Sequence, residues 1–199
     1  MDLEEIEKKI TKKTKAILAV HIYGLPTYMP KIISLAKKYK LMVIEDASEV
    51  IGQKINKRMC GSFGDISTFS FYTNKHITTG EGGMIFTNNK KLAKKFESLK
   101  NLCFEKKRFF HKEIGWNYRM SNIQAAIGLA QYENINKIVK LKRKFGSLYY
   151  EKLKKINHIK LQPKKTFYSN NIFWVIGLVI KNKKYNVEKI RKSLFIEGI

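Results

Sequence analysis

The chain has 199 residues, 44% of them hydrophobic, enough to bury one sizeable core. Its net charge of +24 comes from 40 basic residues, mostly lysines spread along the chain in pairs. Proteins that read nucleic acid specifically cluster arginine forks, so this spread favours a compositional bias over a nucleic-acid partner. The longest apolar run, 172–180, is too short to span a bilayer, and two cysteines, Cys60 and Cys103, show no metal-binding spacing. These features predict a cytoplasmic protein with neither a membrane partner nor a bound metal.

Helical and strand patterns alternate along the chain as far as residue 153. Apolar residues at helical spacing predict helices, and apolar runs that end in turn residues predict strands. Their alternation is typical of an α/β fold with a largely parallel sheet. The predicted helices are 3–12, 29–40, 90–102 and 120–153, and the predicted strands are 15–24, 41–46, 66–72 and 83–88.

The pattern changes near residue 150. Two β-type runs, IKLQP and NNIFWVIGLVIK, follow the long helix predicted over 120–153. They predict a large domain over 1–150, which includes this connecting helix, and the beginning of a smaller α+β domain over 151–199.

Polar residues stand at the ends of two predicted strands, where parallel α/β sheets bind their ligands. Asp46 ends one strand, and Lys75 lies between the strand 66–72 and the stretch GEGG. These glycines fit neither a dinucleotide fingerprint nor a P-loop. Pyridoxal phosphate requires a lysine amine, a carboxylate beside its pyridine nitrogen and a hydroxyl for its phosphate, which Lys75, Asp46 and Ser70 could supply. A strand-terminal aspartate is also common as a turn residue, and a loop lysine as a solvated charge.

Three longer segments carry a family resemblance. VIEDASEVIG, GSFGDISTFSFYTNKHITTGEGGMIFTN and EIGWNYRMSNIQAAIGLAQYE follow one another in the chain. In this order they resemble the sugar aminotransferases of the DegT/StrS type. The resemblance covers nearly the whole chain. It implies the large domain of a fold-type-I, aspartate aminotransferase-like enzyme that depends on pyridoxal phosphate, followed by the start of a small domain.

The resemblance also implies a role for individual residues. Lys75 matches the lysine that forms the imine with the cofactor, and Asp46 matches the acid that pairs with the pyridine nitrogen. Glu49 matches a glutamine or glutamate beside the cofactor ring, and Ser70 matches a phosphate-binding serine. Asn117 matches an asparagine that reaches the phosphate from a partner subunit, which implies a homodimer with shared active sites.

Some positions near these motifs carry less information. His111 and Arg119 lie in the third segment, but an ordinary surface histidine and a helix-start ion pair explain them equally well. Ser48 and Val50 depart from the residues that are common after the family's aspartate. These departures leave the cofactor assignment intact and affect only the detailed surroundings of the ring.

The implied substrate is a keto-sugar linked to a nucleotide. The segment RFFHKEIGWNYRMSNIQAAIGLAQ is most similar to the perosamine-synthase branch. Members of this branch aminate GDP-4-keto-6-deoxymannose with glutamate in surface-polysaccharide synthesis. By comparison with the family, the chain is expected to be an internal part of such an enzyme that lacks a glycine–threonine phosphate loop and an aromatic residue that stacks on the cofactor. A non-catalytic homologue or partner subunit, and a basic nucleic-acid-associated protein, remain as alternatives.

Overall fold

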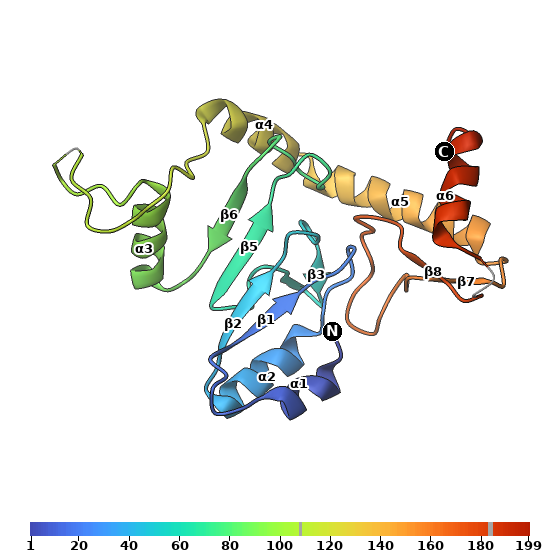
Figure 1. Ribbon diagram of the computed structural model, residues 1–199, viewed down its shortest axis with the longest axis horizontal. Helices are drawn as coiled ribbons and strands as arrows, with labels where there is room; N and C mark the ends of the chain where they lie inside the picture. Colours follow the sequence, from blue (N-terminus) through green and yellow to red (C-terminus); the bar gives the residue numbers. More distant parts are fainter. Residues whose placement is uncertain (108, 183–184) are drawn as a thin grey trace.

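The computed structural model describes residues 1–107, 109–182 and 185–199. A four-stranded sheet with the order β1-β2-β5-β6 lies at its centre (Figure 1). Its strands are β1 (Ala16–Val20), β2 (Met42–Asp46), β5 (Ile66–Ser70) and β6 (Gly83–Phe86). The first three are parallel, and β6 runs antiparallel to β5. The predicted α/β fold with a mixed, mostly parallel sheet is confirmed.

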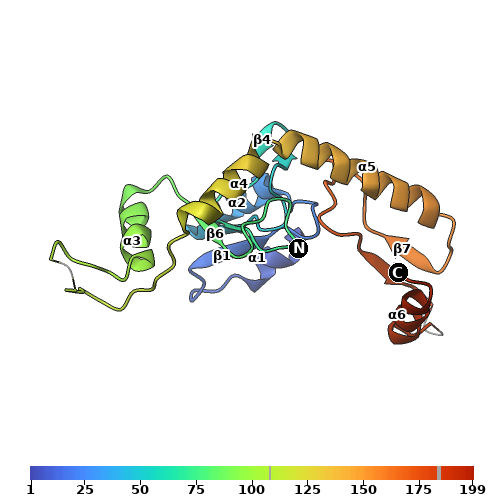
Figure 2. The ribbon, with the colours of Figure 1, turned by 90° about the horizontal axis from the view of Figure 1, so that it is seen from above.

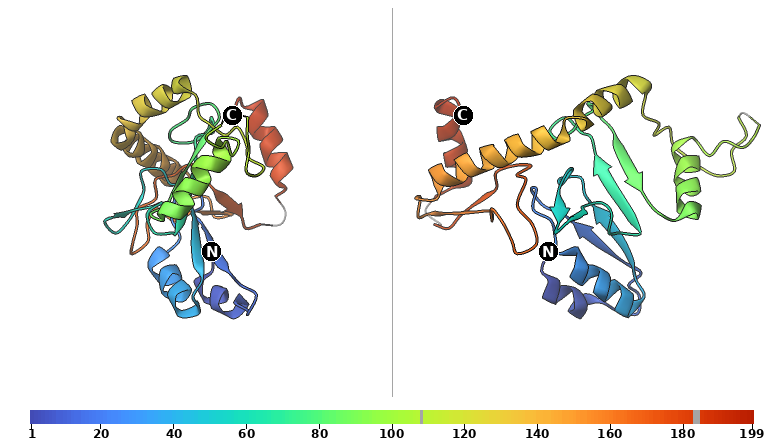
Figure 3. Two further views of the ribbon diagram at one scale, coloured as in Figure 1. Left: turned by 90° about the vertical axis from the view of Figure 1, so that its left-hand side faces the viewer. Right: turned by 180° about the vertical axis from the view of Figure 1, so that it is seen from behind.

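Two helices cover one face of this sheet. α1 (Leu3–Lys9) packs on α2 (Met29–Tyr39), and α2 contacts both β1 and β2. Figure 3 shows the two helices together on the same side of the strands. Side chains that alternate along the strands meet the apolar stripe of α2, as the two periodicities require. The core consists of Ile17, Ala19, Met29, Ile32, Leu35, Ala36, Val43, Ala47, Val50, Ile55 and Cys60.

The ends of α2 follow from the local sequence. Pro30 lies in the first turn, where a helix tolerates a residue without an N–H group. Lys40 adopts a left-handed conformation with φ 54°, and its N–H group bonds to carbonyls of the last turn. The helix therefore ends where β2 begins, and the next strand returns directly into the sheet.

Two further elements lie beyond the strands of the central sheet. A short hairpin pairs β3 (Lys54–Ile55) with β4 (Arg58–Met59), which the sequence pattern did not predict. α3 (Lys90–Lys100) follows β6 and ends two residues before the predicted limit. The side chain of Asn89 caps its N-terminus by accepting bonds from the N–H groups of Lys91 and Leu92.

The single helix predicted over 120–153 is wrong, because two helices occupy this range. α4 (Asn122–Tyr132) begins at a capping box formed by Ser121 and Gln124, and α5 (Ile135–Leu153) follows it. Between them, Asn134 has φ −101° and ψ 9°, and its Nδ2 atom donates to the carbonyl of Ala130 at 3.0 Å. Asparagine side chains compete with the helix for backbone partners in this way.

The last part of the chain lies at the end of α5, opposite α3 (Figure 2). β7 (Ile159–Leu161) and β8 (Leu178–Ile180) form a hairpin, and α6 (Val187–Ile196) follows. The strand predicted over NNIFWVIGLVIK is correct only for its last residues. Residues 170–177 form an irregular segment instead, with Ile172 and Phe173 buried. The predicted domain boundary near residue 150 falls within the last turns of α5 and stays a prediction.

Candidate active site

Asp46 and Ser70 lie at the carboxyl ends of neighbouring strands. Asp46 is the last residue of β2 and pairs in register with Thr68 of β5, two residues before Ser70. Side chains of residues in register, and of every second residue, point to the same face of a sheet. Asp46 and Ser70 are therefore on the face opposite α2. One oxygen of Asp46 accepts a bond from the N–H group of Ser48 at 3.0 Å, and Ser70 Oγ accepts one from Tyr72 at 3.3 Å.

Lys75 places its amine between a carboxylate and an aromatic ring. Its Nζ atom is 4.0 Å from Oε1 of Glu49 and 3.7 Å from the centre of the Trp174 ring. The side chain of Lys75 is only 11% exposed. The other oxygen of Glu49 accepts a 2.7 Å bond from the N–H group of Tyr23, which orients the carboxylate. The structure thus brings Lys75 and Glu49 together, and Asp46 ends β2 three residues before Glu49.

Polar contacts hold the loop that carries Lys75. The amide of Gln131 in α4 bonds to both the N–H group and the carbonyl of Thr78, at 3.1 Å and 2.7 Å. Further along, Thr79 Oγ1 donates to the carbonyl of Glu81 at 2.7 Å. Gly80 has φ +78° with open space where a side chain would stand, whereas a Cβ on Gly82 would lie 2.6 Å from Thr79 Oγ1. This backbone requires glycine at both positions.

A buried hydrogen-bond network lies on the other face of β2, behind Asp46. Glu45 is fully buried, and Nε2 of His21 donates to it at 2.9 Å. The opposite ring atom, Nδ1, accepts a bond from the N–H group of Thr27 at 3.1 Å. The remaining donors to Glu45 are the N–H groups of Gly61, Phe63 and Gly64 and the hydroxyl of Ser67.

The charge of Glu45 is favoured despite its burial. Burial raises the pKa of the Glu45 carboxyl, but the bonds from His21, Gly61 and Phe63 outweigh it and leave the pKa below its usual value. The network fixes the end of β2 and therefore the position from which Asp46 extends.

His76, next to Lys75 in the sequence, is 4% exposed. Within the described residues, neither of its ring nitrogens has a hydrogen-bond partner. Burial lowers the pKa of His76 to about 4, the charges of Lys142 and Lys75 act in the same direction, and the backbone of Ile172 counteracts them in part. The ring is therefore neutral near pH 7, and it adds no second positive charge beside Lys75.

Asn117 is not brought to this group of residues. It forms an isolated bridge with Asn101 and accepts a 2.9 Å bond from Arg119 Nε. It belongs to the largely exposed segment of residues 101–107 and 109–121, which extends with α3 away from the rest of the chain (Figure 1). His111 lies on the same segment, where its Nδ1 atom contacts the carbonyl of Leu102. The structure thus separates the residues of the strand ends from those of this segment.

Two residues that the sequence pattern did not indicate contact the site. Tyr23 precedes a glycine turn and adopts φ 56°, which directs its N–H group to Glu49. Trp174 belongs to the apolar run that was predicted to be a strand. A tryptophan within such a run is ordinarily a core residue, so only its rarity, one of two in the chain, could have indicated it.

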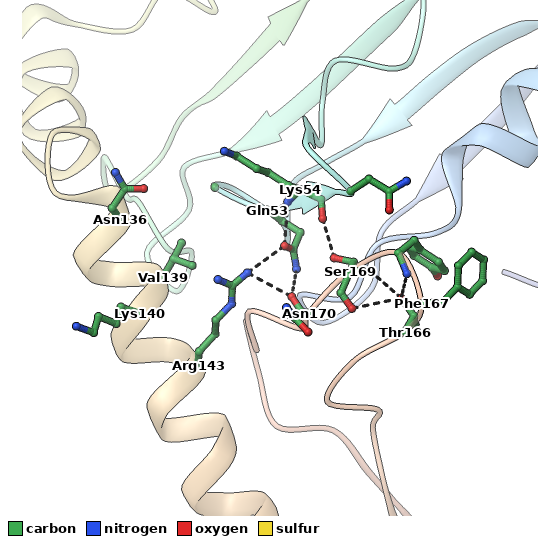
Figure 4. Close-up of a pocket in the computed structure, with 13 residues that line it drawn as sticks. Gln53, Lys54, Asn136, Val139, Lys140, Arg143, Thr166, Phe167, Ser169 and Asn170 are labelled. Atoms are coloured by element: carbon green, nitrogen blue, oxygen red, sulfur yellow. Dashed lines mark hydrogen bonds between the residues drawn. The ribbon is translucent and has the colours of Figure 1, made fainter.

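A cavity of about 610 Å³ lies apart from Lys75, between α5, the region of β3 and the loop 166–170 (Figure 4). Arg143 of α5 reaches across it to Gln53 and to the carbonyl of Asn170 at 3.4 Å each. None of the residues Asp46, Glu49, Ser70 and Lys75 lines this cavity. Its lining contains no carboxylate, histidine or cysteine side chain.

The residues at the strand ends fit pyridoxal phosphate. Lys75 offers a nearly buried amine whose nearest carboxylate is 4.0 Å away, so it is not engaged in a close ion pair. Within the described residues, the carboxylate of Asp46 accepts a single hydrogen bond and keeps acceptor capacity for a protonated pyridine nitrogen. The same part of the chain contains no group of three or more His, Cys, Asp or Glu side chains arranged to hold a metal ion, and none of its helices is long and apolar enough to cross a membrane.

Comparison with known proteins gives a consistent result. Residues 1–199 match the DegT/DnrJ/EryC1/StrS aminotransferase family. GDP-perosamine synthase of Escherichia coli O157:H7 is 42% identical over 195 residues, which cover 98% of this chain and 52% of that protein. GDP-perosamine synthase of Vibrio cholerae is 38% identical over 200 residues and is covered to 53%.

Solved structures agree with these sequence matches. PseC of Helicobacter pylori, an aminotransferase involved in the biosynthesis of pseudoaminic acid, is 30% identical and superposes with a TM-score of 0.90. The match covers 100% of this chain and 54% of PseC. The chain therefore spans about half the length of the relatives that it matches.

Proposed function

The chain belongs to the DegT/DnrJ/EryC1/StrS aminotransferase family, and we propose that it forms the cofactor-binding part of an aminotransferase that converts GDP-4-keto-6-deoxymannose to GDP-perosamine. The cofactor is pyridoxal phosphate, and glutamate is the amino donor. The proposal is supported by the amine of Lys75, held beside Glu49 at the ends of strands whose last residues include Asp46.

Each of these side chains has a separate task. Pyridoxal phosphate, when bound, supplies the electron sink for amino-group transfer. Lys75 provides the amine to which the cofactor attaches, and once released it acts as the base that moves a proton. Asp46 provides a carboxylate for the pyridine nitrogen, Ser70 a hydroxyl for the phosphate, and Glu49 a carboxylate beside the cofactor ring.

The partners follow from the same proposal. The active protein is a homodimer in the cytoplasm, and Asn117, on the largely exposed segment that follows α3, reaches the cofactor phosphate of the partner subunit. The exposure of this segment and the absence of a contact from Asn117 to Lys75 within the described residues support this arrangement. The GDP-perosamine synthases among the relatives support the choice of sugar.

Covalent labelling tests the assignment of the lysine. Incubation with pyridoxal phosphate and reduction with borohydride should attach the cofactor mainly to the peptide that contains Lys75. Lys75→Ala should remove this label, whereas Lys57→Ala, an exposed lysine on the β3–β4 hairpin, should leave it unchanged. Label distributed evenly over the lysines would contradict the proposal.

The sugar requires a second measurement. With glutamate and the cofactor, the aminotransferase of which this chain forms the cofactor-binding part should aminate GDP-4-keto-6-deoxymannose, and mass spectrometry should detect the amino sugar. UDP- and dTDP-linked keto-sugars serve as the controls. Faster amination of one of these control sugars would agree with an aminotransferase but would overturn the assignment of a GDP-linked substrate.

A further inference from the structure

The indole of Trp174 is in contact with both the side chain and the backbone of the lysine loop. Its ring centre is 3.7 Å from Nζ of Lys75, and its Nε1 atom donates to the carbonyl of Asn74 at 2.8 Å. Its ring centre is also 6.0 Å from that of Tyr23, whose N–H group orients Glu49. A residue 100 positions away in sequence from Asn74 thus completes the surroundings of the Lys75 amine.

The backbone around Trp174 is fixed from three directions. Lys142 of α5 donates from Nζ to the carbonyl of Trp174 at 2.9 Å. The N–H group of Phe173 donates to Asn171 Oδ1 at 2.7 Å. The ring of Phe173 lies so close to α5 that a Cβ on Gly146 would be 2.1 Å from it. The indole therefore projects from a rigid support rather than from a free loop.

The Lys75 side chain itself has little else to define its position. A lysine has four rotatable bonds, and its nearest carboxylate oxygen is 4.0 Å away, beyond normal hydrogen-bond length. The aromatic face attracts the ammonium group, and the bond to Asn74 limits the movement of the backbone beside it. The two contacts act on adjacent residues and restrict the same amine.

We propose that Trp174 is a positioning residue, which holds the Lys75 amine and its loop where the cofactor attaches. This inference rests on the proposed function. The ring face orients the amine, while the Nε1–H group fixes the loop through Asn74. Trp174 is not part of the chemical step, because it has no group that titrates near pH 7.

Two substitutions separate these contributions. Trp174→Phe keeps an aromatic face and loses the Nε1–H donor, and Trp174→Leu loses both. The readout is the share of borohydride-trapped pyridoxal phosphate found on the Lys75 peptide relative to all other lysine peptides. We expect this share to fall about tenfold in Trp174→Leu and by a smaller factor in Trp174→Phe, since misplaced reactive groups lose reactivity steeply.

Phe167→Leu is the matched control. Phe167 is an aromatic residue of the same C-terminal part, 85% exposed, whose ring contacts Tyr28 and Tyr168. It should keep the wild-type share of label. Circular dichroism establishes that each variant is folded. If Trp174→Leu does not fold, the Trp174→Phe variant decides, and a share of label equal to the wild type in the folded variants overturns the proposal.

Fluorescence provides a readout independent of labelling. The chain has two tryptophans, Trp116 and Trp174, so Trp116→Phe leaves Trp174 as the only indole. Attachment of pyridoxal phosphate at Lys75 should quench its emission, and the added Lys75→Ala change should abolish this quenching. Selective labelling of Lys75 without quenching overturns only the proposed role of Trp174 and leaves the proposed function in place. Failure to label Lys75 selectively in the wild-type chain overturns the proposed function itself.

Discussion

Glu45 and Asp46 are adjacent carboxylates at the end of β2, and the two faces of the sheet give them opposite surroundings. On the helix-covered face, Glu45 is fully buried and accepts hydrogen bonds from five groups. On the other face, Asp46 is half-buried and, among the described residues, its carboxylate accepts one bond, from Ser48. The difference indicates that Glu45 holds the strand end in place, whereas Asp46 has acceptor capacity left for a ligand.

The largest effect is expected for Asp46, whose substitution should lower turnover without lowering stability. Asp46→Asn keeps the shape and removes the negative charge beside the cofactor nitrogen. We expect turnover to fall on the order of a hundredfold to a thousandfold, as when other fixed electrostatic groups of active sites are removed. The free energy of unfolding should change little. Amino transfer from glutamate and urea denaturation measure the two quantities, and near-normal turnover would place the catalytic carboxylate elsewhere.

The reverse pattern is expected for the neighbouring residue. Glu45→Gln places an amide NH₂ group among donors and removes bonds to a charged acceptor. A loss of about 2–4 kcal/mol in the free energy of unfolding follows, because buried donors are left without a partner. Urea denaturation of wild type and variant gives this difference. A loss similar to that of Asp46→Asn would show that the two faces do not differ as described.

A pH series tests a third buried group, His76. Its pKa is lowered to about 4 in the folded protein, so below about pH 6.5 the unfolded chain binds a proton that the folded chain does not. Stability should therefore fall by up to about 1.4 kcal/mol per pH unit from pH 6.5 towards 4. His76→Leu should remove this part of the slope. Unfolding curves with the same pH dependence in both proteins would exclude His76 as the cause.

The smallest effect on stability is expected for Asn117, on the largely exposed segment that follows α3. Asn117→Ala should change the free energy of unfolding by less than about 0.5 kcal/mol, because its only described contacts are with Asn101 and Arg119. Its effect on function should depend on a second chain. Mixing the Asn117→Ala and Lys75→Ala proteins should restore one intact site per heterodimer and therefore part of the turnover. No recovery would contradict the assignment of Asn117 to the partner's site.

The sequence was informative where local patterns decide the structure. The strand end at Asp46 follows from a short apolar run bounded by turn residues, and α2 follows from its period and its proline. β5 ends at Ser70, two residues before the predicted limit. The run around Trp174 was wrongly predicted to be a strand, because the pattern of an apolar stretch does not distinguish a strand from a buried irregular segment. Its conformation depends on packing against Gly146 and Lys142, which no local pattern contains. At the break between α4 and α5, the Asn134 side chain likewise bonds to the carbonyl of Ala130, a contact that the apolar period does not contain.

The contact between Trp174 and Asn74 also has a consequence for synthesis. The ribosome makes the chain from residue 1 onward, so the loop with Lys75 emerges 100 residues before the indole that packs on it. At roughly 5–20 residues per second, this delay is about 5–20 s. During this interval the sheet and α2 can already fold, but the lysine has no aromatic neighbour from the C-terminal segment. We therefore expect nascent chains to acquire the cofactor only after this last segment has been translated.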